Sequence, residues 1–499
     1  MSDGKLSEQS QQVVRQAMSG SSFTVAAQAI TTVVGLGRSI ILARLLAPEE
    51  FGVVALALFY VSLIANLSAF GLGTALVQKK EEATGALATY FVLRTSLATA
   101  GFLLTAALVP ILGILHDGRP TLIQIVVPLA ATELIQAISS TPLTLLYRRL
   151  AFRRIAIINV LSSVFMTIVA PLLAYAGWGI WSLVLGEQLT GVLVTFVAVW
   201  FWRPPWRLNL NIDWQLARQY LSFGKFVALS GQLTYLLDRF DDFWTGAVLG
   251  NAALGYYSKA YEYARYPRRV ISSPLNSVLF VGYTRLQDDL PALAEFFFRS
   301  ASLMFRANSF FSLALFMIVP DFTVLVLGDK WLPMVTVFRL LIVYSLLDPL
   351  FVISTHLTTA LGEPEVLTRI KLMQLVVFVP AVMLFGRLWQ IEGVALAADL
   401  MLVVGMGAVF RAVRRSLPVA TGRILWPPLL AAVIAGLVTT VVFQQFMSGS
   451  VLWLQMGLKG IVSVVIFGLI LFLLERHEMI RNFTLLRHYL LSGRVRPGT

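Results

Sequence analysis

The sequence predicts an all-α integral membrane protein with about fourteen transmembrane helices. Of its 499 residues, 58% are hydrophobic and only 13% are charged, whereas about a quarter of the residues are charged in a soluble domain. Apolar runs of about 20 residues, long enough to cross a bilayer as a helix, recur along the whole chain. The loops between these runs are short. We therefore expect no folded domain outside the membrane.

The apolar runs form two blocks of six, followed by two more. In order, the predicted spans are 21–45, 51–77, 87–115, 121–146, 154–176, 178–202, 222–249, 253–283, 295–327, 333–361, 366–387, 390–412, 425–446 and 451–475. This pattern divides the chain into six parts. They are a cytoplasmic N-terminal segment 1–20, an N-lobe 21–202, a cytoplasmic linker 203–221, a C-lobe 222–416, two extra spans within 417–475 and a basic cytoplasmic tail 476–499.

The distribution of basic residues predicts the orientation. The formal net charge is +13, and the positive-inside rule explains this excess without a nucleic-acid partner. With both ends in the cytoplasm, most Lys and Arg outside the spans fall on the cytoplasmic side. The exceptions are Arg44, Arg119, Lys330 and Arg387. The basic tail is expected to lie on the anionic inner surface of the membrane.

Two short stretches repeat at a constant offset of 203 residues. Each begins at the outer turn between the first and second span of its block. The identical pairs are Leu46 and Leu249, Gly52 and Gly255, and Ala57 and Ala260. Because six spans separate the copies, both blocks have the same orientation. Such a parallel repeat predicts two six-helix lobes around a central cavity that opens by alternating access.

The residues of these turns resemble a known family. RLLAPEEFG at 44–52 and GLGTALV at 71–77 are similar to the opening hairpin of bacterial polysaccharide transporters and oligosaccharide flippases. LDRFDDF at 237–243, with the turn that follows it, is similar to their seventh helix. These Wzx-like proteins belong to the multidrug/oligosaccharidyl-lipid/polysaccharide (MOP) exporter superfamily.

The resemblance implies a V-shaped pair of lobes in the bacterial inner membrane. It also implies that the protein flips undecaprenyl-pyrophosphate-linked oligosaccharide toward the periplasm, for exopolysaccharide, capsule or O-antigen (lipopolysaccharide) assembly. Other polysaccharide assembly proteins are then candidate partners, besides the lipid-linked substrate and membrane lipids. Family members often have twelve spans, so the two extra spans here fit the longer members.

Basic residues within the predicted spans are candidates for substrate binding. A charge at the centre of a bilayer costs roughly 2.5–3.5 kcal/mol on insertion scales, and guanidinium groups match phosphate oxygens bidentately. Alternatively, some of these side chains reach the interface from misplaced span boundaries. The residues predicted to line a cationic cavity are Arg38, Arg94, Arg239, Arg265, Arg268, Arg269, Arg299 and Arg306. Pro267 and Pro274 are expected to kink the eighth span.

Acidic residues within the spans suggest coupling to an ion gradient. Crowded carboxylates raise one another's pKa, which suits H⁺ transfer, and they could equally hold Na⁺. The alternative is that each acid neutralises an arginine, for example Asp242 with Arg239. The candidates for ion coupling are Asp238, Asp241, Asp242, Glu133 and Glu187. We expect no metal centre and no organic cofactor.

Other functions are alternatives to this flippase. An exporter of another lipid-linked precursor, from the same superfamily, stays open. A multidrug cation exporter of that superfamily needs a net negative site, and the excess of arginine within the spans argues against it. A membrane-embedded polymerase or ligase would carry a large outer loop with catalytic residues, which the short outer loops exclude. The aspartate pairs at 241–242 and 288–289 lack the further acids or histidines that transfer chemistry requires. The protein is therefore predicted not to be an enzyme.

Overall fold

The computed structural model describes residues 8–73, 76, 84–116, 120–203, 210–446 and 451–476, and its regular structure there is helical. The α-helices are α1 (Glu8–Leu45), α2 (Pro48–Ala69), α4 (Thr84–Leu115), α5 (Pro120–Arg148), α6 (Phe152–Tyr175), α7 (Thr190–Phe201), α8 (Trp214–Trp244), α9 (Asn251–Ala264), α10 (Ser273–Arg285), α11 (Leu290–Phe322), α12 (Met334–Leu340), α13 (Ile342–Ala360), α14 (Pro364–Ser416), α15 (Thr421–Phe446) and α16 (Leu452–Leu474). Part of the predicted linker, 204–209, and the tail from residue 477 lie outside the described residues.

In this described part, eleven helices are long and apolar enough to cross a membrane. One of them, α14, is two helices, because Trp389 and Gln390 have non-helical dihedral angles. Gly393 permits the sharp reversal, since a methyl group there would lie 1.9 Å from the Phe385 carbonyl oxygen. Counting α14 as two helices gives twelve. The helix α8 and the broken helix from α9 to α10 are more polar, and with them the number of predicted spans, fourteen, is reached. The all-α membrane fold is thus confirmed.

Local sequence signals explain where several helices begin. Pro48 opens α2, and the Glu50 carboxylate accepts a hydrogen bond from the Ala47 backbone N–H at 2.7 Å. The Asp213 carboxylate caps α8 by accepting hydrogen bonds from two backbone N–H groups. Asp289 caps α11 in the same way through the Ala292 N–H. Each cap satisfies N–H groups that have no partner within the helix.

The eighth predicted span is broken, as its prolines led us to expect. A turn at Arg265 separates α9 from a π-helical turn, Arg268–Ser272, which leads into α10. A π-helical turn has more residues than an α-helical one and shifts the positions that follow it. Arg265 and Arg269, which would share one face of a regular α-helix with Glu262, are therefore separated by this break.

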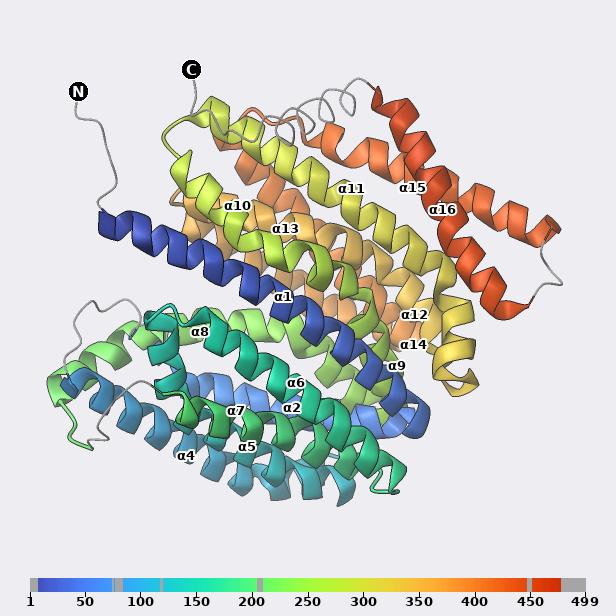
Figure 1. Cartoon of the computed structure of the whole chain (residues 1–499). Coiled ribbons are helices and arrows are strands. Elements are labelled where there is room, and N and C mark those ends of the chain that lie inside the picture. The colour runs from blue at the N-terminus through green and yellow to red at the C-terminus, as the bar shows by residue number, and fades with distance from the viewer. Residues whose placement is uncertain are drawn as a thin grey trace, which may run out of the picture. The chain divides into compact units, whose positions relative to one another are not determined.

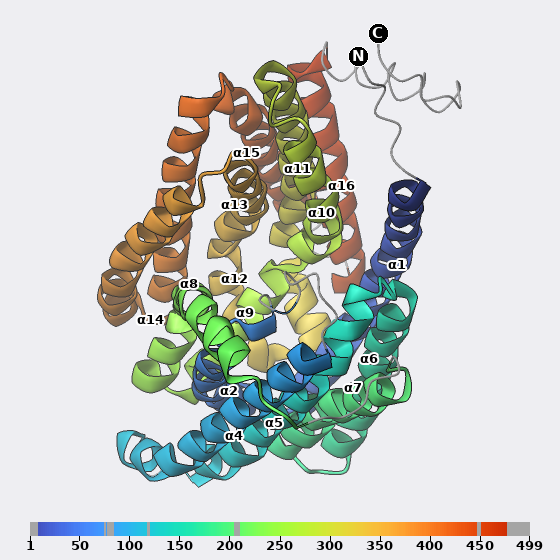
Figure 2. The same cartoon turned by 90° about the vertical axis from the view of Figure 1, so that its left-hand side faces the viewer.

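The chain packs as two compact units. Unit 1 comprises Met1–Tyr261, Val326–Val337 and Lys371–Met401, and unit 2 comprises Glu262–Leu325, Phe338–Ile370 and Leu402–Thr499. In unit 1, α4, α5 and α7 run side by side, and α6 packs on α7 and α1 (Figure 1). In unit 2, α11 packs against α13, α15 and α16 (Figure 2). The division into an N-lobe and a C-lobe at 203–221 stays a prediction.

The two-helix structure of α14 is testable, because the chain has no cysteine of its own. Gln390, at the reversal, is exposed, and Met401, within the second helix, is only 5% exposed. We expect a membrane-impermeant maleimide to label a Gln390→Cys variant in intact cells and to leave Met401→Cys unlabelled. Labelling of Gln390→Cys only after permeabilisation would contradict the predicted orientation of this hairpin.

Candidate functional site

In unit 1, two of the predicted arginines form ion pairs with predicted acids. Arg38 on α1 lies 3.0 Å from Glu187, and their side chains are 13% and 25% exposed. Arg239 on α8 lies 2.8 Å from Asp242, one turn further along the helix. Here the arginine is 52% exposed, whereas the aspartate is 6% exposed. The second pair therefore presents its guanidinium outward while its carboxylate stays buried.

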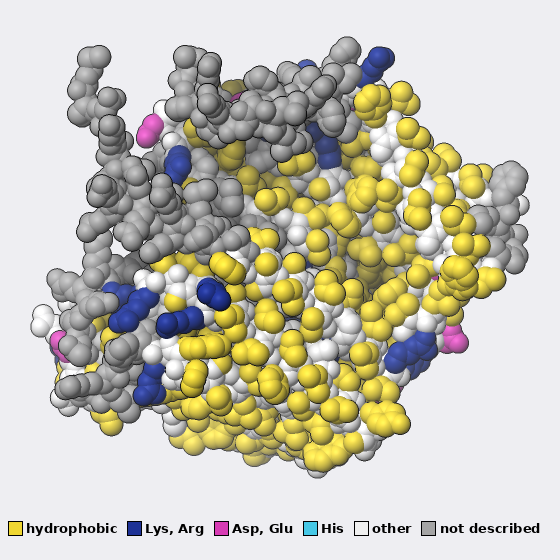
Figure 3. Space-filling view, in the orientation of Figure 1, with side chains coloured by type: hydrophobic (Ala, Val, Ile, Leu, Met, Phe, Trp, Pro, Cys, Tyr) yellow, Lys and Arg dark blue, Asp and Glu magenta, His cyan; other side chains and the backbone are white. Residues whose placement is uncertain are grey.

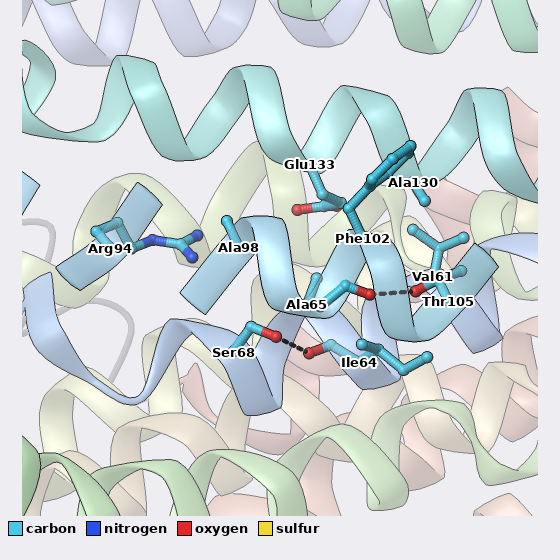
Figure 4. A pocket seen from close by; sticks show the side chains of 11 residues that line it. Val61, Ile64, Ala65, Ser68, Arg94, Ala98, Phe102, Thr105, Ala130 and Glu133 are labelled. Atoms are coloured by element: carbon cyan, nitrogen blue, oxygen red, sulfur yellow. Dashed lines mark hydrogen bonds between the residues drawn. The ribbon is translucent and has the colours of Figure 1, made fainter. Parts of the chain in front are cut away.

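Arg94 and Glu133 line a small cavity between α2, α4 and α5. Their side chains point toward one another (Figure 4), and no direct ion pair joins them in the described structure. The cavity offers about 10 Å³, room for about one water molecule. A single water there could bridge the two charged groups. This site is polar and small, which suits a water or an ion better than a sugar phosphate.

In unit 2, the predicted arginines differ in their surroundings. Arg268 donates two hydrogen bonds to Asp348, at 2.7 and 2.9 Å, and the side chains are 28% and 6% exposed. Arg306 pairs with Glu475 at 2.7 Å, and both are largely buried, at 14% and 7%. The Arg306 pair fits a structural role, because it exposes little charge. The Arg268 pair resembles that of Arg239, since the arginine is again the more exposed partner.

The remaining predicted arginines of unit 2 lie nearer its surface. Arg299 pairs with Glu295 on the same helix, and both are about half exposed. Arg269 is exposed and stacks on the Tyr266 ring at 5.3 Å. Arg265 lies at the break after α9 and is half-buried. Each unit thus presents some of its predicted arginines, whereas the cavity between the lobes stays a prediction.

Asp241 has different partners from the other predicted acids. It is 3% exposed and accepts hydrogen bonds from the Tyr257 hydroxyl at 2.6 Å and from the Asp242 backbone N–H at 3.0 Å. Neither donor is a cation. The Asp241 carboxylate is therefore held by a hydroxyl and a backbone amide. Asp238, by contrast, is half-buried and makes no hydrogen bond or ion pair with the described residues.

The repeated glycines of the sequence meet in space within unit 1. A methyl group on Gly52 of α2 would lie 1.8 Å from the Asn251 carbonyl oxygen, and one on Gly255 of α9 would lie 1.9 Å from that of Pro48. Pro48 and Asn251 are themselves related by the offset of 203 residues. The contact is therefore reciprocal, as expected where two copies of a repeat meet about a local two-fold axis. Only glycine permits backbones to approach this closely.

Polar side chains beside this glycine crossing bind the ends of two helices. Lys330 Nζ donates to the carbonyls of Arg44 and Leu46, at 2.9 and 2.7 Å, where α1 ends. Arg44 Nε in turn donates to the Val326 carbonyl at 2.6 Å. The last carbonyls of a helix lack partners within it and attract cations. Burial lowers the pKa of Lys330, and Arg44 adds to this, whereas Glu50 opposes it.

Trp331 fills the space beside these contacts. Its side chain is fully buried, and its indole N–H donates to the Ala43 carbonyl at 2.8 Å. Its ring lies edge-on to those of Phe51 and Tyr256, with centroids 5.5 and 6.0 Å apart. We call the glycine crossing together with Arg44, Lys330 and Trp331 the closure. It joins α1, α2, α9 and the segment 326–331 through reversible, non-covalent contacts.

Sequence reasoning missed parts of this arrangement. Lys330 and Trp331 lie in a short turn that has no periodic pattern, and Lys330 was counted only for orientation. Asp321 was also missed, although it pairs with Lys459 at 2.6 Å. The identities of the repeat did mark Gly52 and Gly255. The available signal for the closure was therefore the repeat itself.

Comparisons with known proteins settle the family. A family described as polysaccharide biosynthesis proteins matches residues 41–336, which is more than half of the chain. The chain belongs to this family. The lipopolysaccharide biosynthesis protein WzxC of Escherichia coli K12 is 24% identical over 390 residues, 78% of each chain. The predicted family relationship is confirmed.

Solved structures support the fold. A structure of the lipid II flippase MurJ in an inward closed conformation has a TM-score of 0.75 and 13% identity, covering 92% of this chain and 99% of that one. An inward-facing multidrug MATE transporter of the MOP superfamily has a TM-score of 0.57 and 16% identity, covering 77% and 95%. At these identities the likeness establishes the fold alone. The chain thus shares the multi-helix fold of these two structures, with eleven candidate membrane spans among its described residues.

Replacing Gly52 by alanine tests the closure. The added methyl group meets a backbone carbonyl, so we expect the melting temperature in detergent to fall, by an amount that corresponds to roughly 1–3 kcal/mol. Gly35→Ala is the matched control, because nothing lies within 4 Å of its added methyl group. There the gain in helix propensity, up to about 1 kcal/mol, should keep or raise the melting temperature. Equal melting temperatures for the two variants would count against the close crossing.

Proposed function

We propose that this protein flips undecaprenyl-pyrophosphate-linked oligosaccharide across the bacterial inner membrane for the assembly of a surface polysaccharide. The observation that carries the proposal is the MurJ-like fold over 92% of the chain, in a chain of the polysaccharide biosynthesis family. MurJ is named as a flippase of lipid II, a lipid-linked precursor, and WzxC is named for lipopolysaccharide biosynthesis. We infer from these two likenesses together that this chain transports a lipid-linked glycan precursor.

The uneven exposure within two ion pairs supports an anionic head group as the cargo. Arg239 and Arg268 are each more exposed than their aspartate partners. A guanidinium carries five N–H donors, and Arg239 donates through Nη1 alone to Asp242. Each arginine can therefore bind phosphate oxygens while its aspartate holds it in place. An exporter of organic cations would instead expose the carboxylates.

In the proposed cycle the closure lies on the periplasmic side. The positive-inside rule places its turns there, and its contacts must break for the head group to leave. The hydrogen bonds at the helix ends can break, and the two glycine-containing helices can move apart, without separating any of the ion pairs described above. The oligosaccharide head group crosses between the lobes while the polyprenyl chain stays in lipid.

Substitutions of Arg239 and Arg268 test this proposal in a deletion strain. Arg239→Lys and Arg268→Lys keep the charge that each aspartate needs but lose the forked geometry. We expect polymer export to fall by roughly 10- to 150-fold, because a charge-assisted hydrogen bond worth roughly 1.5–3 kcal/mol is lost. Lipid-linked oligosaccharide should accumulate on the cytoplasmic side. Arg369→Lys is the control, because Arg369 is 80% exposed and its partner Glu365 is 3.9 Å away.

Two outcomes would overturn the proposal. If the linked oligosaccharide crosses the membrane in the deletion strain and merely stays unpolymerised, the protein acts after flipping. If both lysine variants export polymer as the wild type does, the exposed arginines do not bind the head group. Membrane levels of each variant, measured by immunoblot, separate these results from poor expression.

We further propose that Asp241 is the proton-coupling group. Among the predicted acids, Asp242 and Glu187 are held by arginines, whereas Asp241 is buried against a hydroxyl and an amide. A carboxyl in such a site can take up and release a proton as its surroundings change. Na⁺ coupling is the alternative, and it would need several oxygen ligands around the ion.

Asp241→Asn keeps the shape of the side chain and an acceptor for Tyr257 but cannot take up a proton. We expect export to fall by roughly tenfold or more, which corresponds to about 1.4 kcal/mol in the barrier. The remaining export should no longer respond to a protonophore. Asp238→Asn is the matched control and should export normally. Wild-type export and protonophore response in Asp241→Asn would exclude Asp241 as the coupling site.

A further inference from the structure

We propose that a groove between α6 and α7 binds one anionic phospholipid. The groove has a volume of about 470 Å³, and its lining residues are all apolar. Leu161 and Phe165 of α6 form one wall, and Leu193, Val197 and Phe201 of α7 form the other. Phe201 is 81% exposed and Val197 is 64% exposed, so the groove opens outward. An apolar groove of this kind accepts a hydrocarbon chain.

The groove exists because α6 and α7 touch at both ends of it. At one end the Ser162 hydroxyl donates to the Gly191 carbonyl at 2.9 Å, and a methyl group on Gly191 would lie 2.7 Å from the Met166 sulfur. At the other end Arg154 Nη1 donates to the Trp202 carbonyl at 3.3 Å. Val199 is fully buried in the apolar cluster on which this part of α7 packs. These contacts hold the two helices together at each end of the groove.

The length of the groove matches one leaflet. Nine residues separate Leu193 from Trp202 along α7, which is about 14 Å of helix. Half of the hydrocarbon core of a bilayer is about 15 Å thick. A phospholipid acyl chain spans one leaflet, whereas the undecaprenyl chain of the proposed substrate is several times longer. The dimensions therefore favour a phospholipid over the substrate lipid.

The charges at the Trp202 end indicate the head group. Arg154 and Arg203 are both exposed there, and the Arg203 guanidinium stacks on the Trp200 ring at 4.6 Å. Stacking leaves the edge of the guanidinium open for hydrogen bonds. Lys and Arg side chains gather over this end of the helices, beside an apolar flank (Figure 3). Between Arg148 and Asp213 the sequence has a single acid, Glu187, which pairs with Arg38.

This end also carries the basic residues that the predicted orientation places in the cytoplasm. Anionic lipids of that leaflet attract basic residues near the surface. One acyl chain would fill the groove, and the phosphate would lie between Arg154 and Arg203. The groove shares no lining residue with the proposed head-group arginines or with the closure. Its occupation is therefore independent of the flippase proposal.

Native mass spectrometry of the full-length protein in detergent tests the site. The probes are dioleoylphosphatidylglycerol and dioleoylphosphatidylcholine, added at matched concentrations. We expect one phosphatidylglycerol to be retained more strongly than the rest. Arg154→Gln and Arg203→Gln should each weaken its retention about fivefold, and Arg369→Gln should not. Val197→Trp, which fills the groove, should abolish retention, whereas Val433→Trp on the exposed face of α15 should not.

Three outcomes would overturn the proposal. Equal retention of phosphatidylglycerol by the wild type and by Val197→Trp would show that the groove is not the site. Equal retention of both lipids would show that the arginines do not select an anion. Displacement of phosphatidylglycerol by undecaprenyl phosphate at equal concentration would assign the groove to the substrate lipid. The melting temperature of each variant establishes that a loss of binding does not reflect unfolding.

Discussion

Charged groups inside a bilayer must find partners, and this constraint shapes both units of the protein. Removing one partner of a buried ion pair costs about 3–5 kcal/mol, because the other charge remains buried. The pairs of Arg38 with Glu187 and of Arg306 with Glu475 join helices that are distant in the sequence. Each ion pair described above lies within a single unit. Each of these charges is therefore paired by a residue of its own unit.

The closure follows a different physical principle. Its glycine crossing depends on the absence of side chains at Gly52 and Gly255, and its polar contacts go to backbone carbonyls at helix ends. Contacts of this kind are specific when formed and can be replaced by water when broken. The reciprocity of the crossing also has an evolutionary reading. If the two helix pairs arose by duplication, each copy would present the same surface to the other. A single glycine in the original pair would then have permitted both halves of the contact.

The sequence predicted much of the fold because the bilayer restricts what a chain can do. Length and apolarity identified nearly every span, and the two prolines predicted the break after α9. The repeat located Gly52 and Gly255 without showing that they meet. The ion-pair partner of each arginine was harder to predict. The pairing of Asp242 with Arg239 follows from helical spacing, whereas Asp348 lies 80 residues from its partner Arg268. The role of Trp331 could not be predicted either, because its contacts come from segments almost 290 residues distant.

Exposure within each ion pair separates structural arginines from candidate binding arginines more clearly than sequence position does. Arg306 and its glutamate are both buried, so a ligand could reach this arginine only by unpacking the helices. Arg239 and Arg268 have buried aspartates behind them and remain accessible. A carboxylate behind a guanidinium fixes its orientation and lowers the cost of keeping it in the membrane, without occupying all of its donors. Under the proposed function, a phosphate bound to such an arginine would replace water rather than the aspartate. The buried aspartate would then stay paired when the phosphate binds and when it leaves.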